Sequence, residues 1–490
     1  MNSGKICVSV CAQTADELIA KVRTAAALAD VVEVRFDCLA PSELLSAMTS
    51  IRPDQFTIPL IAALMPVDQG GKRQMTMRER VEFWQALPAG WWADEPGVYE
   101  TNCRIASYHE VDGEPKDPVS LYRFLRAMPA DVIKIAFASG DASDGIAVWK
   151  LMAQPHAFVP IAMGEAGKWT RILGLAHGAY MTYAALDAGE ETAAGQLTVD
   201  DVQRVYRVKD LDRSTQVYGV IGDHVSSSFS PLIHNAAFAS LGINSVFIPL
   251  QVKNLDAFIK RMVSAETREL DLNFAGFAVT MPHKVKVMKY LDHIDDDAVR
   301  VGAVNTIKIE ADKLIGYNTD VKGCLEPLKA RYGELSEAKI LVIGAGGAAR
   351  ACIAGLQDEG AEVTVAARDK TKAKVLSDDL AVRVIPLSQV KCQSPKIEGY
   401  PFDIIVNATP VGMAGPLAED TPLTAPQLAG VKFVFDLVTR VDKTPLMIEA
   451  EAAGVPSIGG AEMLLTQAAK QFEIWTGRQA PVDIMRGAIS

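Results

Sequence analysis

A glycine-rich loop carries the clearest chemical signal in this chain. An apolar, strand-like run leads directly into the sequence GAGGAA at residues 344–349, and a helical pattern follows it. In a dinucleotide site Gly344 makes the tight turn, Gly346 lets the backbone approach a pyrophosphate, and Ala349 allows close packing of helix on strand. An ordinary strand–helix turn can carry the same glycines, but a second strand-like run at 362–366 completes the unit. We therefore expect a dinucleotide site, with the phosphates at the helix N-terminus.

The end of that second strand bears on the choice of dinucleotide. An acid at this place usually holds the ribose 2′-hydroxyl of NAD, whereas an arginine accommodates the 2′-phosphate of NADP. The strand ends in Ala367, Arg368 and Asp369. Arg368 therefore favours NADP, and the neighbouring Asp369 should weaken that preference.

Two lysines occupy positions from which they could do chemistry. Lys134 lies inside the apolar run VIKIA, where an unpaired ammonium would be costly. Burial would lower its pKa and give a free amine able to form a Schiff base with a ketone, although a strand-end lysine that reaches solvent is the alternative. Lys284 follows the run through TMPH, and Asp320 ends the turn sequence GYNTD. Both are expected at carboxyl ends of strands, where α/β sheets bind ligands, and could serve proton transfer to a carbonyl.

Size and composition describe a soluble protein of several domains. For 490 residues we expect roughly two to four domains of about 100–200 residues each. No apolar run reaches the roughly 18–20 residues of a membrane span, and the N-terminus lacks a signal-peptide layout, so we expect a cytoplasmic protein. The net charge of −11 argues against nucleic acid as a partner and leaves anionic substrates to local Arg and Lys. The seven cysteines are scattered without a CxxC pair, so we expect reduced thiols, with neither disulfides nor a metal site.

Strand-like runs alternate with helical stretches from end to end, which predicts an α/β fold with parallel strands. About eight such runs in the first part of the chain fit a closed (β/α)8 barrel. Two further α/β units then begin, one with the strand 217–221 and one with the glycine loop. The segment 87–98, rich in tryptophan and proline, is expected to be a packed local insertion. The barrel strands are expected at Ile6–Val10, Val31–Arg35, Thr57–Ala62, Val98–Thr101, Arg104–Ser107, Val132–Ala136, Phe158–Met163 and Ala179–Thr182.

Six short motifs in the second half resemble those of shikimate dehydrogenases. They are GVIGDHVSSSFSPLIHNAAF (219–238), GFAVTMPHK (276–284), GAVNTI (302–307), GYNTD (316–320), NATPVGM (407–413) and GGAEMLLTQAAKQFEIWTG (459–477). The resemblance implies a substrate domain and a Rossmann domain, with Lys284 and Asp320 as the catalytic pair. The substrate-binding residues that it implies are Ser228, Ser230, Thr280, Asn305 and Gln467. The implied cofactor-binding residues are Gly344, Gly346, Gly347, Ala348, Arg368, Asn407, Thr409, Gly412 and Met413.

Other positions in this half have weaker or altered signals. The family positions that match His224, His234 and His283 are not proton donors, so we expect His234 to pack in a helix and assign no role to the other two. Thr439 and Val441 stand where the family commonly has a tyrosine and a proline beside the active site. We expect this change to alter substrate affinity more than reaction type.

Five motifs in the first half resemble those of type I 3-dehydroquinate dehydratases, over roughly residues 5–205. They are EVRFD (33–37), SYHE (107–110), DVIKIAF (131–137), MGEAGKWTRILG (163–174) and TAAGQ (192–196). The resemblance implies that Lys134 forms the imine and that His109 is the general acid and base. Glu33 and Arg35 are two residues apart and so point to one face of their strand. The substrate-binding residues that the resemblance implies are Glu33, Arg35, Arg171, Thr192 and Gln196.

The loop after the third barrel strand departs from that family. Met65 stands in place of an arginine that contacts substrate, and Gln69 in place of a glutamate that supports the histidine. Lys72, Arg73 or Arg78 could supply the missing charge, or the barrel could be impaired.

The two halves are consecutive in one pathway and together resemble the bifunctional dehydratase–dehydrogenases of plants and some bacteria. We expect a barrel domain at 1–208, a substrate domain at 217–330 with the helix 462–490 packed back on it, and an NADP-binding Rossmann domain at 335–460. The expected substrates are 3-dehydroquinate, 3-dehydroshikimate and shikimate. Two alternatives remain open: a barrel that is a decayed binding or scaffolding module, and a dehydrogenase that acts on quinate.

Overall fold

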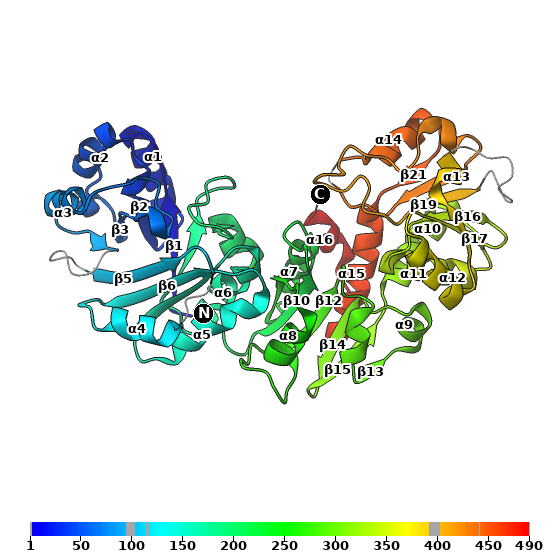
Figure 1. Cartoon of the computed structure of the whole chain (residues 1–490), viewed down its shortest axis with the longest axis horizontal. Coiled ribbons are helices and arrows are strands. Elements are labelled where there is room, and N and C mark those ends of the chain that lie inside the picture. The colour runs from blue at the N-terminus through cyan, green and yellow to red at the C-terminus, as the bar shows by residue number, and fades with distance from the viewer. Residues whose placement is uncertain (1, 95–102, 114–116, 392–401, 441, 490) are drawn as a thin grey trace. The chain divides into compact units, whose positions relative to one another are not determined.

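The structure is a computed structural model that describes the whole chain apart from residues 1, 95–102, 114–116, 392–401, 441 and 490 (Figure 1). The chain divides into two compact units. One comprises residues 1–231 and 243–274, and the other comprises residues 232–242 and 275–490. Among the described helices, none has the length and apolar character needed to cross a membrane.

The first part of the chain forms a parallel barrel. The strands lie in the order β7-β6-β5-β4-β3-β2-β1-β8, with the short β9 (Leu197–Thr198) beside β8. A backbone hydrogen bond of 2.9 Å from Tyr180 N to the Phe158 carbonyl joins the lead-in of β8 to β7 and closes the ring. The expected (β/α)8 barrel is therefore confirmed. The eight strands are β1 (Lys5–Val10), β2 (Val31–Arg35), β3 (Leu60–Ala63), β4 (Trp92–Ala93), β5 (Cys103–Glu110), β6 (Val132–Ala138), β7 (Ala157–Met163) and β8 (Met181–Ala185).

The fourth barrel strand lies where a local insertion was expected. Trp92 and Ala93 pair in parallel with β3 on one side and β5 on the other. The neighbouring Trp91 is buried and packs edge-on against Phe36, with ring centroids 5.5 Å apart. A strand of two residues is too short to show an alternating pattern, so its periodicity could not be recognised. The expected strand Val98–Thr101 lies outside the described residues.

Alternation along each barrel strand decides which side chains face the interior. On β6, Val132 and Ala136 belong to a cluster made of strand residues alone, whereas Ile133 and Ile135 pack against helices. Lys134 shares the parity of Val132 and therefore points into the barrel. The surrounding helices are α1 (Ala15–Ala26), α2 (Leu44–Ser50), α3 (Met77–Ala86), α4 (Pro118–Arg126), α5 (Ile146–Lys150) and α6 (Lys168–Leu173) (Figure 1).

Polar caps start several of these helices. The Thr14 hydroxyl accepts from Glu17 N at α1, and Thr76 forms a reciprocal capping box with Glu79 at α3. Asp117 caps α4, whose first residue is Pro118. Each cap satisfies backbone N–H groups that the helix itself leaves unpaired.

The second sheet is mixed, in contrast to the parallel sheet expected from the sequence. Its strand order is β11-β10-β12-β14-β15-β13, and β10 and β11 are parallel. The pairs β12–β14 and β14–β15 are antiparallel. Ala311 and Asp312 connect β14 to β15 with φ values of 48° and 61°, the left-handed backbone of a two-residue hairpin turn. These strands are β10 (Gln216–Gly222), β11 (Ser245–Gln251), β12 (Phe274–Val279), β13 (His293–Ile294), β14 (Thr306–Glu310) and β15 (Lys313–Tyr317).

The third sheet is fully parallel and has the order β18-β17-β16-β19-β20-β21. The chain runs outward in both directions from the neighbours β16 and β19, so the order reverses between them, and ligands bind at such switch points. Helix α11 (Gly347–Asp358) follows β16 directly, as the glycine loop predicts. The strands are β16 (Lys339–Ile343), β17 (Glu362–Ala367), β18 (Arg383–Pro386), β19 (Ile404–Asn407), β20 (Phe433–Asp436) and β21 (Ser457–Ile458).

The remaining helices surround these two sheets. Helix α15 (Gly460–Thr476) packs on α10 (Asp320–Tyr332) and on β14. The others are α7 (Ser230–Ser240), α8 (Leu255–Phe258), α9 (Asp296–Val301), α12 (Lys370–Leu380), α13 (Leu387–Lys391), α14 (Pro445–Ala452) and α16 (Val482–Gly487).

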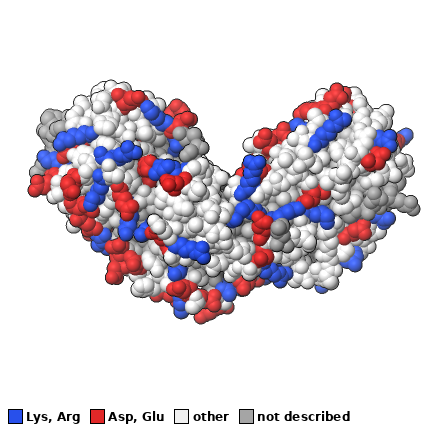
Figure 2. Space-filling view, turned by 180° about the vertical axis from the view of Figure 1, so that it is seen from behind, with Lys and Arg blue, Asp and Glu red and all other residues white. Residues whose placement is uncertain are grey.

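Surface charge is mixed on the face shown in Figure 2. Lys and Arg side chains alternate with Asp and Glu, and the described part of this face has no broad basic area. This distribution agrees with the net charge of −11.

Cys11 and Cys38 form a disulfide, which corrects the expectation that all thiols are reduced. Cys11 directly follows β1, and Cys38 ends a short turn after β2. Because β1 and β2 are parallel neighbours, their carboxyl ends bring the two Cα atoms within 5.6 Å. The pairing depends on strand adjacency, which Cys spacing alone does not reveal. Cys7, Cys324 and Cys352 are buried and free.

The disulfide should stabilise the barrel because it closes a loop between residues 27 positions apart. Cross-linking a loop of that length reduces the entropy of the unfolded chain, with an expected effect of about 3–4 kcal/mol. Replacing both residues (Cys11→Ser with Cys38→Ser) should lower the urea midpoint of the barrel accordingly. Reductant should destabilise the wild-type protein but not the double variant. Free thiols at both positions in protein purified without reductant would contradict the assignment.

Candidate active sites

The barrel interior holds a buried cluster of charges around Lys134. The Lys134 ammonium donates to Glu33 Oε1 at 3.2 Å and to Asp94 Oδ2, and all three side chains are at most 3% exposed. Lys134 Nζ also lies 4.7 Å from the centre of the Tyr183 ring. Three strands therefore converge on one amine at the barrel centre.

The carboxylates reverse the pKa shift expected for Lys134. Burial alone would lower the pKa of this lysine, but the charges of Asp94 and Glu33 outweigh burial and raise it. The expectation of a free amine created by burial is thus wrong, and the lysine rests as an ammonium. Burial raises the pKa of Asp94, whereas Lys134 and Arg35 overcome burial at Glu33 and lower its pKa. Asp94 is accordingly the better proton acceptor of the two.

Asp94 is the site residue that the sequence analysis missed. It directly follows β4, and its backbone N–H donates to the Ala62 carbonyl of the neighbouring β3 at 3.0 Å. The sequence analysis interprets residues 87–98 as a packed local insertion, so it gives Asp94 no role in the site. An acid directly after an apolar Trp-Trp-Ala run, between two recognised strands, was the available signal.

His109 on β5 is held by the loop that contains Gln69. Its backbone N–H donates to Gln69 Oε1 at 3.1 Å, and its Nδ1 lies 3.3 Å from the Gln69 carbonyl oxygen. Because a carbonyl can only accept, Nδ1 carries the proton and Nε2 keeps a free lone pair. Desolvation and the nearby Lys134 charge lower the pKa of His109 to about 3, so the ring is neutral at physiological pH. Gln69 therefore positions the histidine without the carboxylate found in the family.

Arg35 forms an ion pair with a neighbouring carboxylate. Its guanidinium forms two 2.8 Å hydrogen bonds with the Asp37 carboxylate. Asp37 also accepts from the backbone N–H groups of Met65 and Lys72 and so organises the loop after β3. Arg78, one candidate for the missing charge, is exposed and paired with Glu82.

Arg171 is a buried cation without a carboxylate partner within hydrogen-bond distance among the described residues. It is 2% exposed, its Nε has no hydrogen-bond partner, and its Nη1 reaches only the Tyr183 carbonyl at 3.5 Å. Burial lowers the pKa of Arg171 to about 10. A buried guanidinium in this state is costly unless an anion joins it.

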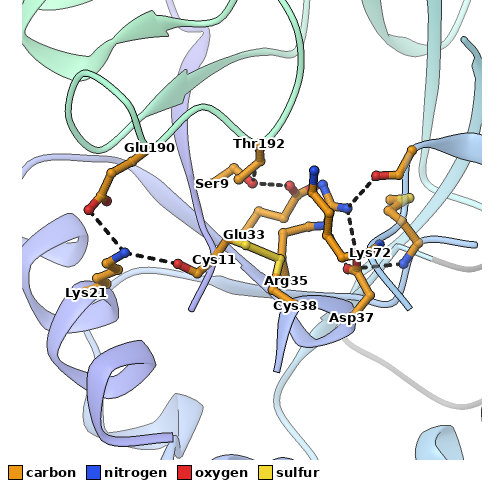
Figure 3. Close-up of a disulfide and its surroundings, with 12 residues drawn as sticks. Ser9, Cys11, Lys21, Glu33, Arg35, Asp37, Cys38, Lys72, Glu190 and Thr192 are labelled. Atoms are coloured by element: carbon orange, nitrogen blue, oxygen red, sulfur yellow. Dashed lines mark hydrogen bonds and ion pairs between the residues drawn. A yellow bond between two sulfur atoms is a disulfide. The ribbon is translucent and has the colours of Figure 1, made fainter. Parts of the chain in front are cut away.

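The loop that contains Thr192 is tied to the charge cluster (Figure 3). The Thr192 hydroxyl donates to Ser9 Oγ at 2.9 Å, and Ser9 donates to Glu33 Oε2 at 2.5 Å. Gln196 Oε1 accepts from Thr192 N at 2.7 Å. The structure thus brings the expected barrel residues to one end of the barrel, and adds Ser9 to them.

A second site lies in the other unit, around Lys284 and Asp320. Lys284 Nζ is 2.5 Å from Asp320 Oδ2, and Asp320 is 4% exposed at the start of α10. The lysine stem runs across the glycine loop, where a Cβ on Gly347 would lie 2.9 Å from Lys284 Cδ. Gly347 therefore leaves room for the lysine, a role that the sequence did not indicate.

Amide and hydroxyl groups surround Asp320. Asn305 Nδ2 donates to Asp320 Oδ1 at 2.8 Å, to Thr319 Oγ1 at 2.9 Å and to Gln467 Oε1 at 3.4 Å. Thr280 directly follows the strand β12 (Phe274–Val279), which leads to Lys284. The structure thus brings Asn305 and Gln467 together with the lysine–aspartate pair.

Ser228 and Ser230 belong to the first unit, in and after the loop that follows β10. Ser230 N donates to Ser228 Oγ at 3.3 Å, so the two hydroxyls occupy one turn at the start of α7.

The three histidines of this half differ in exposure. His234 is fully buried in α7 beside Trp475, with ring centroids 5.1 Å apart, and burial lowers its pKa to about 3. It packs inside the protein, as expected. His283 is also buried, whereas His224 is exposed.

The glycine loop fits a dinucleotide phosphate. Gly344 has φ +126°, and a Cβ there would lie 2.8 Å from the Ala408 carbonyl oxygen. A Cβ on Gly346, at the N-cap of α11, would meet nothing within 4 Å, so the backbone is open to approach. Gly347 and Ala348 form the first turn of α11, whose free N–H groups suit a phosphate.

The side chains expected beside the glycine loop differ in exposure, and some of them serve to hold a neighbouring loop. Arg368 and Met413 are exposed. Asn407 is fully buried, where its Oδ1 accepts from the Thr409 backbone and hydroxyl at 3.1 and 2.7 Å, and Gly412 bends the same loop at φ +94°. Asn407 and Thr409 therefore shape this loop.

Asp369 has a local partner that the sequence did not suggest. Its carboxylate accepts from Thr371 N at 3.0 Å and Lys372 N at 3.1 Å, and so caps α12. This capping occupies the acid that was expected to oppose a 2′-phosphate. Thr439 is half-buried, and Val441 lies outside the described residues.

Comparisons with known proteins identify the families that the two halves of the chain match. Residues 6–90 and 99–213 match the family described as type I 3-dehydroquinase, and residues 220–307 match the shikimate dehydrogenase substrate binding domain. Residues 326–411 match shikimate/quinate 5-dehydrogenase, and residues 460–489 match the shikimate 5′-dehydrogenase C-terminal domain. The chain therefore combines a lyase barrel with an NADP-dependent oxidoreductase.

Full-length similarity shows the family. The chain is 31% identical over 525 aligned positions to the chloroplastic bifunctional 3-dehydroquinate dehydratase/shikimate dehydrogenase of Arabidopsis thaliana, covering 99% of this chain and 84% of that protein. It is 40% identical over 280 positions to the NADP(+) shikimate dehydrogenase of Methanococcus maripaludis, covering 57% and 98%. A crystal structure of a shikimate dehydrogenase with NADP+ matches with 37% identity and a TM-score of 0.50, over 56% of this chain and 94% of that one. This chain belongs to the bifunctional 3-dehydroquinate dehydratase/shikimate dehydrogenase family.

The substitution Asp94→Asn should destabilise the barrel and lower the pKa of Lys134. The buried ammonium keeps Glu33 as a partner, so losing the charge-assisted hydrogen bond to Asp94 should cost about 1.5–3 kcal/mol. Urea unfolding followed at the barrel measures the loss. Asp54→Asn is the matched control, since it breaks the exposed Arg52–Asp54 pair and should cost about 0–1 kcal/mol. Equal losses for the two variants would contradict the account of the cluster.

Proposed function

We propose that the barrel dehydrates 3-dehydroquinate through an imine on Lys134 and that the second half reduces 3-dehydroshikimate to shikimate with NADPH. The observation that carries the proposal is the buried Lys134 between two carboxylates, with a neutral His109 in the same barrel interior. We assign the barrel to residues 1–208, the substrate domain to 217–330 with the helix 462–490, and the Rossmann domain to 335–460.

Imine formation begins with a proton transfer, because Lys134 rests as an ammonium. Its proton passes to Asp94, whose pKa is raised by burial, and the neutral amine attacks the ketone carbon of the substrate. The resulting carbinolamine loses water and gives an iminium ion. Glu33 stays ionised beside it, since the pKa of Glu33 is lowered, and stabilises the positive charge.

His109 then serves as base and as acid. Its free Nε2 removes the proton alpha to the iminium carbon, which gives an enamine. The enamine expels the β-hydroxyl group, which takes the same proton from His109 and leaves as water. A histidine whose pKa is about 3 is a weak base but a strong acid once protonated, so the second step benefits more. Hydrolysis of the product imine returns Lys134.

Arg171 is the proposed partner of the substrate carboxylate. Its buried Nε lacks a hydrogen-bond partner, so an incoming anion would satisfy it. Thr192 and Gln196 hold the adjoining loop against the site through Ser9 and Glu33. Arg35 acts more indirectly, since Asp37 already neutralises it.

In the reductase half, Lys284 and Asp320 are the proposed proton-transfer pair. When bound, NADPH supplies the hydride, and the glycine loop, Arg368 and the loop of Asn407, Thr409, Gly412 and Met413 would hold it. Lys284 donates a proton to the oxygen of the ketone, and Asp320 orients the lysine through their 2.5 Å contact. The groups proposed to bind the ring hydroxyls and the carboxylate are Thr280, Asn305, Gln467, Ser228 and Ser230.

Two substitutions should separate the two reactions. Lys284→Ala should lower kcat for shikimate oxidation by about 10²–10⁴-fold, because it removes a positioned proton-transfer group. Lys134→Ala should abolish dehydration and the adduct that borohydride traps with 3-dehydroquinate. Each variant should keep the other activity, and urea unfolding of the altered unit is its control for folding. Loss of both reactions from one folded variant, or an adduct on another lysine, would contradict the assignment.

Assays of the wild-type protein decide the remaining alternatives. Absence of dehydration would indicate an impaired barrel, with Met65 and Gln69 as the first positions to restore. Faster oxidation of quinate than of shikimate would change the substrate assignment of the second half.

Arg368 should select NADP over NAD. It is exposed at the end of β17, and Asp369 beside it is engaged in capping α12. One charge-assisted contact with the 2′-phosphate is worth about 1.5–3 kcal/mol, so Arg368→Ala should raise KM for NADP by about 10–100-fold and leave KM for NAD nearly unchanged. Steady-state kinetics with both cofactors measure the difference. Equal increases for the two cofactors would show that Arg368 does not read the phosphate.

A further inference from the structure

A chain of buried hydrogen bonds leads from α15 to the Lys284–Asp320 pair. Gln471 Nε2 donates to Thr306 Oγ1 at 3.0 Å and to the Asn305 carbonyl at 3.3 Å. Thr306 Oγ1 donates to Asn305 Oδ1 at 2.8 Å, and Asn305 Nδ2 donates to Asp320 Oδ1 at 2.8 Å. Gln471, Thr306 and Asn305 are at most 2% exposed.

The direction of each hydrogen bond in this chain follows from the previous one. The Asn305 backbone carbonyl can only accept, so the group of Gln471 that faces it must be the NH2. That NH2 also faces Thr306, whose hydroxyl must then accept from Gln471 and direct its single proton elsewhere. The remaining partner at 2.8 Å is Asn305 Oδ1, which also accepts from Thr319 N at 2.8 Å.

We propose that Gln471 and Thr306 are positioning residues that orient the Asn305 amide so that its NH2 faces Asp320. This inference rests on the proposed catalytic role of Lys284 and Asp320 and extends it to two residues that touch neither the pair nor the substrate. The Asn305 carbonyl fixes the direction of the Gln471 hydrogen bonds. The Thr306 hydroxyl and the Asn305 amide then pass this donor–acceptor order on to the Asp320 carboxylate.

The orientation matters because the opposite one would be repulsive. A reversed Asn305 amide would set its oxygen against Asp320 Oδ1 and its NH2 against the donors Thr306 and Thr319. The carboxylate would lose a hydrogen-bond donor and face an oxygen instead, which would move it from its position beside Lys284. Among the described residues, Lys284 and the Cys352 thiol on α11 interact with Asp320, and His234 on α7 forms a hydrogen bond with Gln471.

Packing alone does not require these polar groups. Ala468 and Phe472 on α15 are fully buried, and Trp475 Nε1 donates to the Ile307 carbonyl at 2.9 Å, so the helix has other attachments to β14. An apolar side chain at position 471 or 306 would satisfy the same volume. The polar side chains of Gln471 and Thr306 are therefore explained by their effect on the orientation of the Asn305 amide.

The experiment compares Thr306→Val with Thr306→Ser in the full-length protein. Valine keeps the shape but loses the hydroxyl, so kcat for shikimate oxidation should fall about 10–100-fold, as when a supporting group of a functional ligand is removed. The loss should appear in kcat, while KM for NADP stays unchanged. Serine keeps the hydroxyl and should restore kcat to within about 3-fold of wild type, since one retained hydrogen bond accounts for most of the effect.

Controls separate orientation from stability. Thr364→Val, at a buried position on β17 outside the chain of hydrogen bonds, should leave kcat unchanged. Urea unfolding of the second unit reports that each variant is folded, because all three positions lie in that unit. Should Thr306→Val fail to fold, Gln471→Leu is tested with the same readouts. This substitution removes the donor to Thr306 Oγ1, so the Thr306 hydroxyl is no longer required to donate to Asn305.

The outcomes distinguish this inference from the proposed function. Wild-type activity with loss in Lys284→Ala supports the function. An active enzyme in which Thr306→Val and Gln471→Leu keep the wild-type kcat overturns the inference alone. A wild-type protein that does not oxidise shikimate overturns both.

Discussion

A buried ammonium must have compensating charge, and the barrel is organised around this requirement. Lys134 lies inside the ring of strands, where an uncompensated cation would be costly, and Asp94 and Glu33 meet it from two other strands. The same carboxylates keep the lysine protonated, so the chemistry depends on a proton leaving it when substrate arrives. The difference between the two acids, with the pKa of Asp94 raised and that of Glu33 lowered, provides one acceptor and one permanent counter-charge.

The reductase site meets the same requirement with hydrogen bonds in addition to charge. Among the described residues Lys284 pairs with one carboxylate, that of Asp320, and this carboxylate is itself supported by the Asn305 amide. Because an amide can be reversed, its orientation has to be determined by neighbours whose donor or acceptor character is unambiguous. The backbone N–H of Thr319 can only donate to Asn305 Oδ1. The Thr306 hydroxyl accepts from Gln471 and therefore donates its own proton to the same oxygen. This explains why polar side chains occupy an otherwise well-packed helix interface.

The sequence patterns predicted the positions of those site residues that lie in long strands or directly after them. Lys134, Lys284, Asp320 and the glycine loop all sit beside recognisable apolar runs, so their positions could be deduced. Asp94 could not, because its strand has two residues and shows no period. The pKa direction of Lys134 depends on which strands face each other across the barrel, and the Cys11–Cys38 disulfide depends on the adjacency of β1 and β2. Such pairings are properties of the closed ring and are not visible in a single segment.

The two departures of the barrel from its family are best understood together. Met65 removes a positive charge and Gln69 removes a negative one, so the pair leaves the net charge of the site unchanged. Within the described barrel interior Arg35 is balanced by Asp37, and Lys134 by Asp94 and Glu33, whereas Arg171 retains an open Nε. Either family residue alone would upset this balance, because an added arginine would compete with Arg171 for the anion and an added glutamate would raise the pKa of His109. Under the proposed function, this paired change leaves Arg171 as the cation of the described barrel interior that has no carboxylate within hydrogen-bond distance.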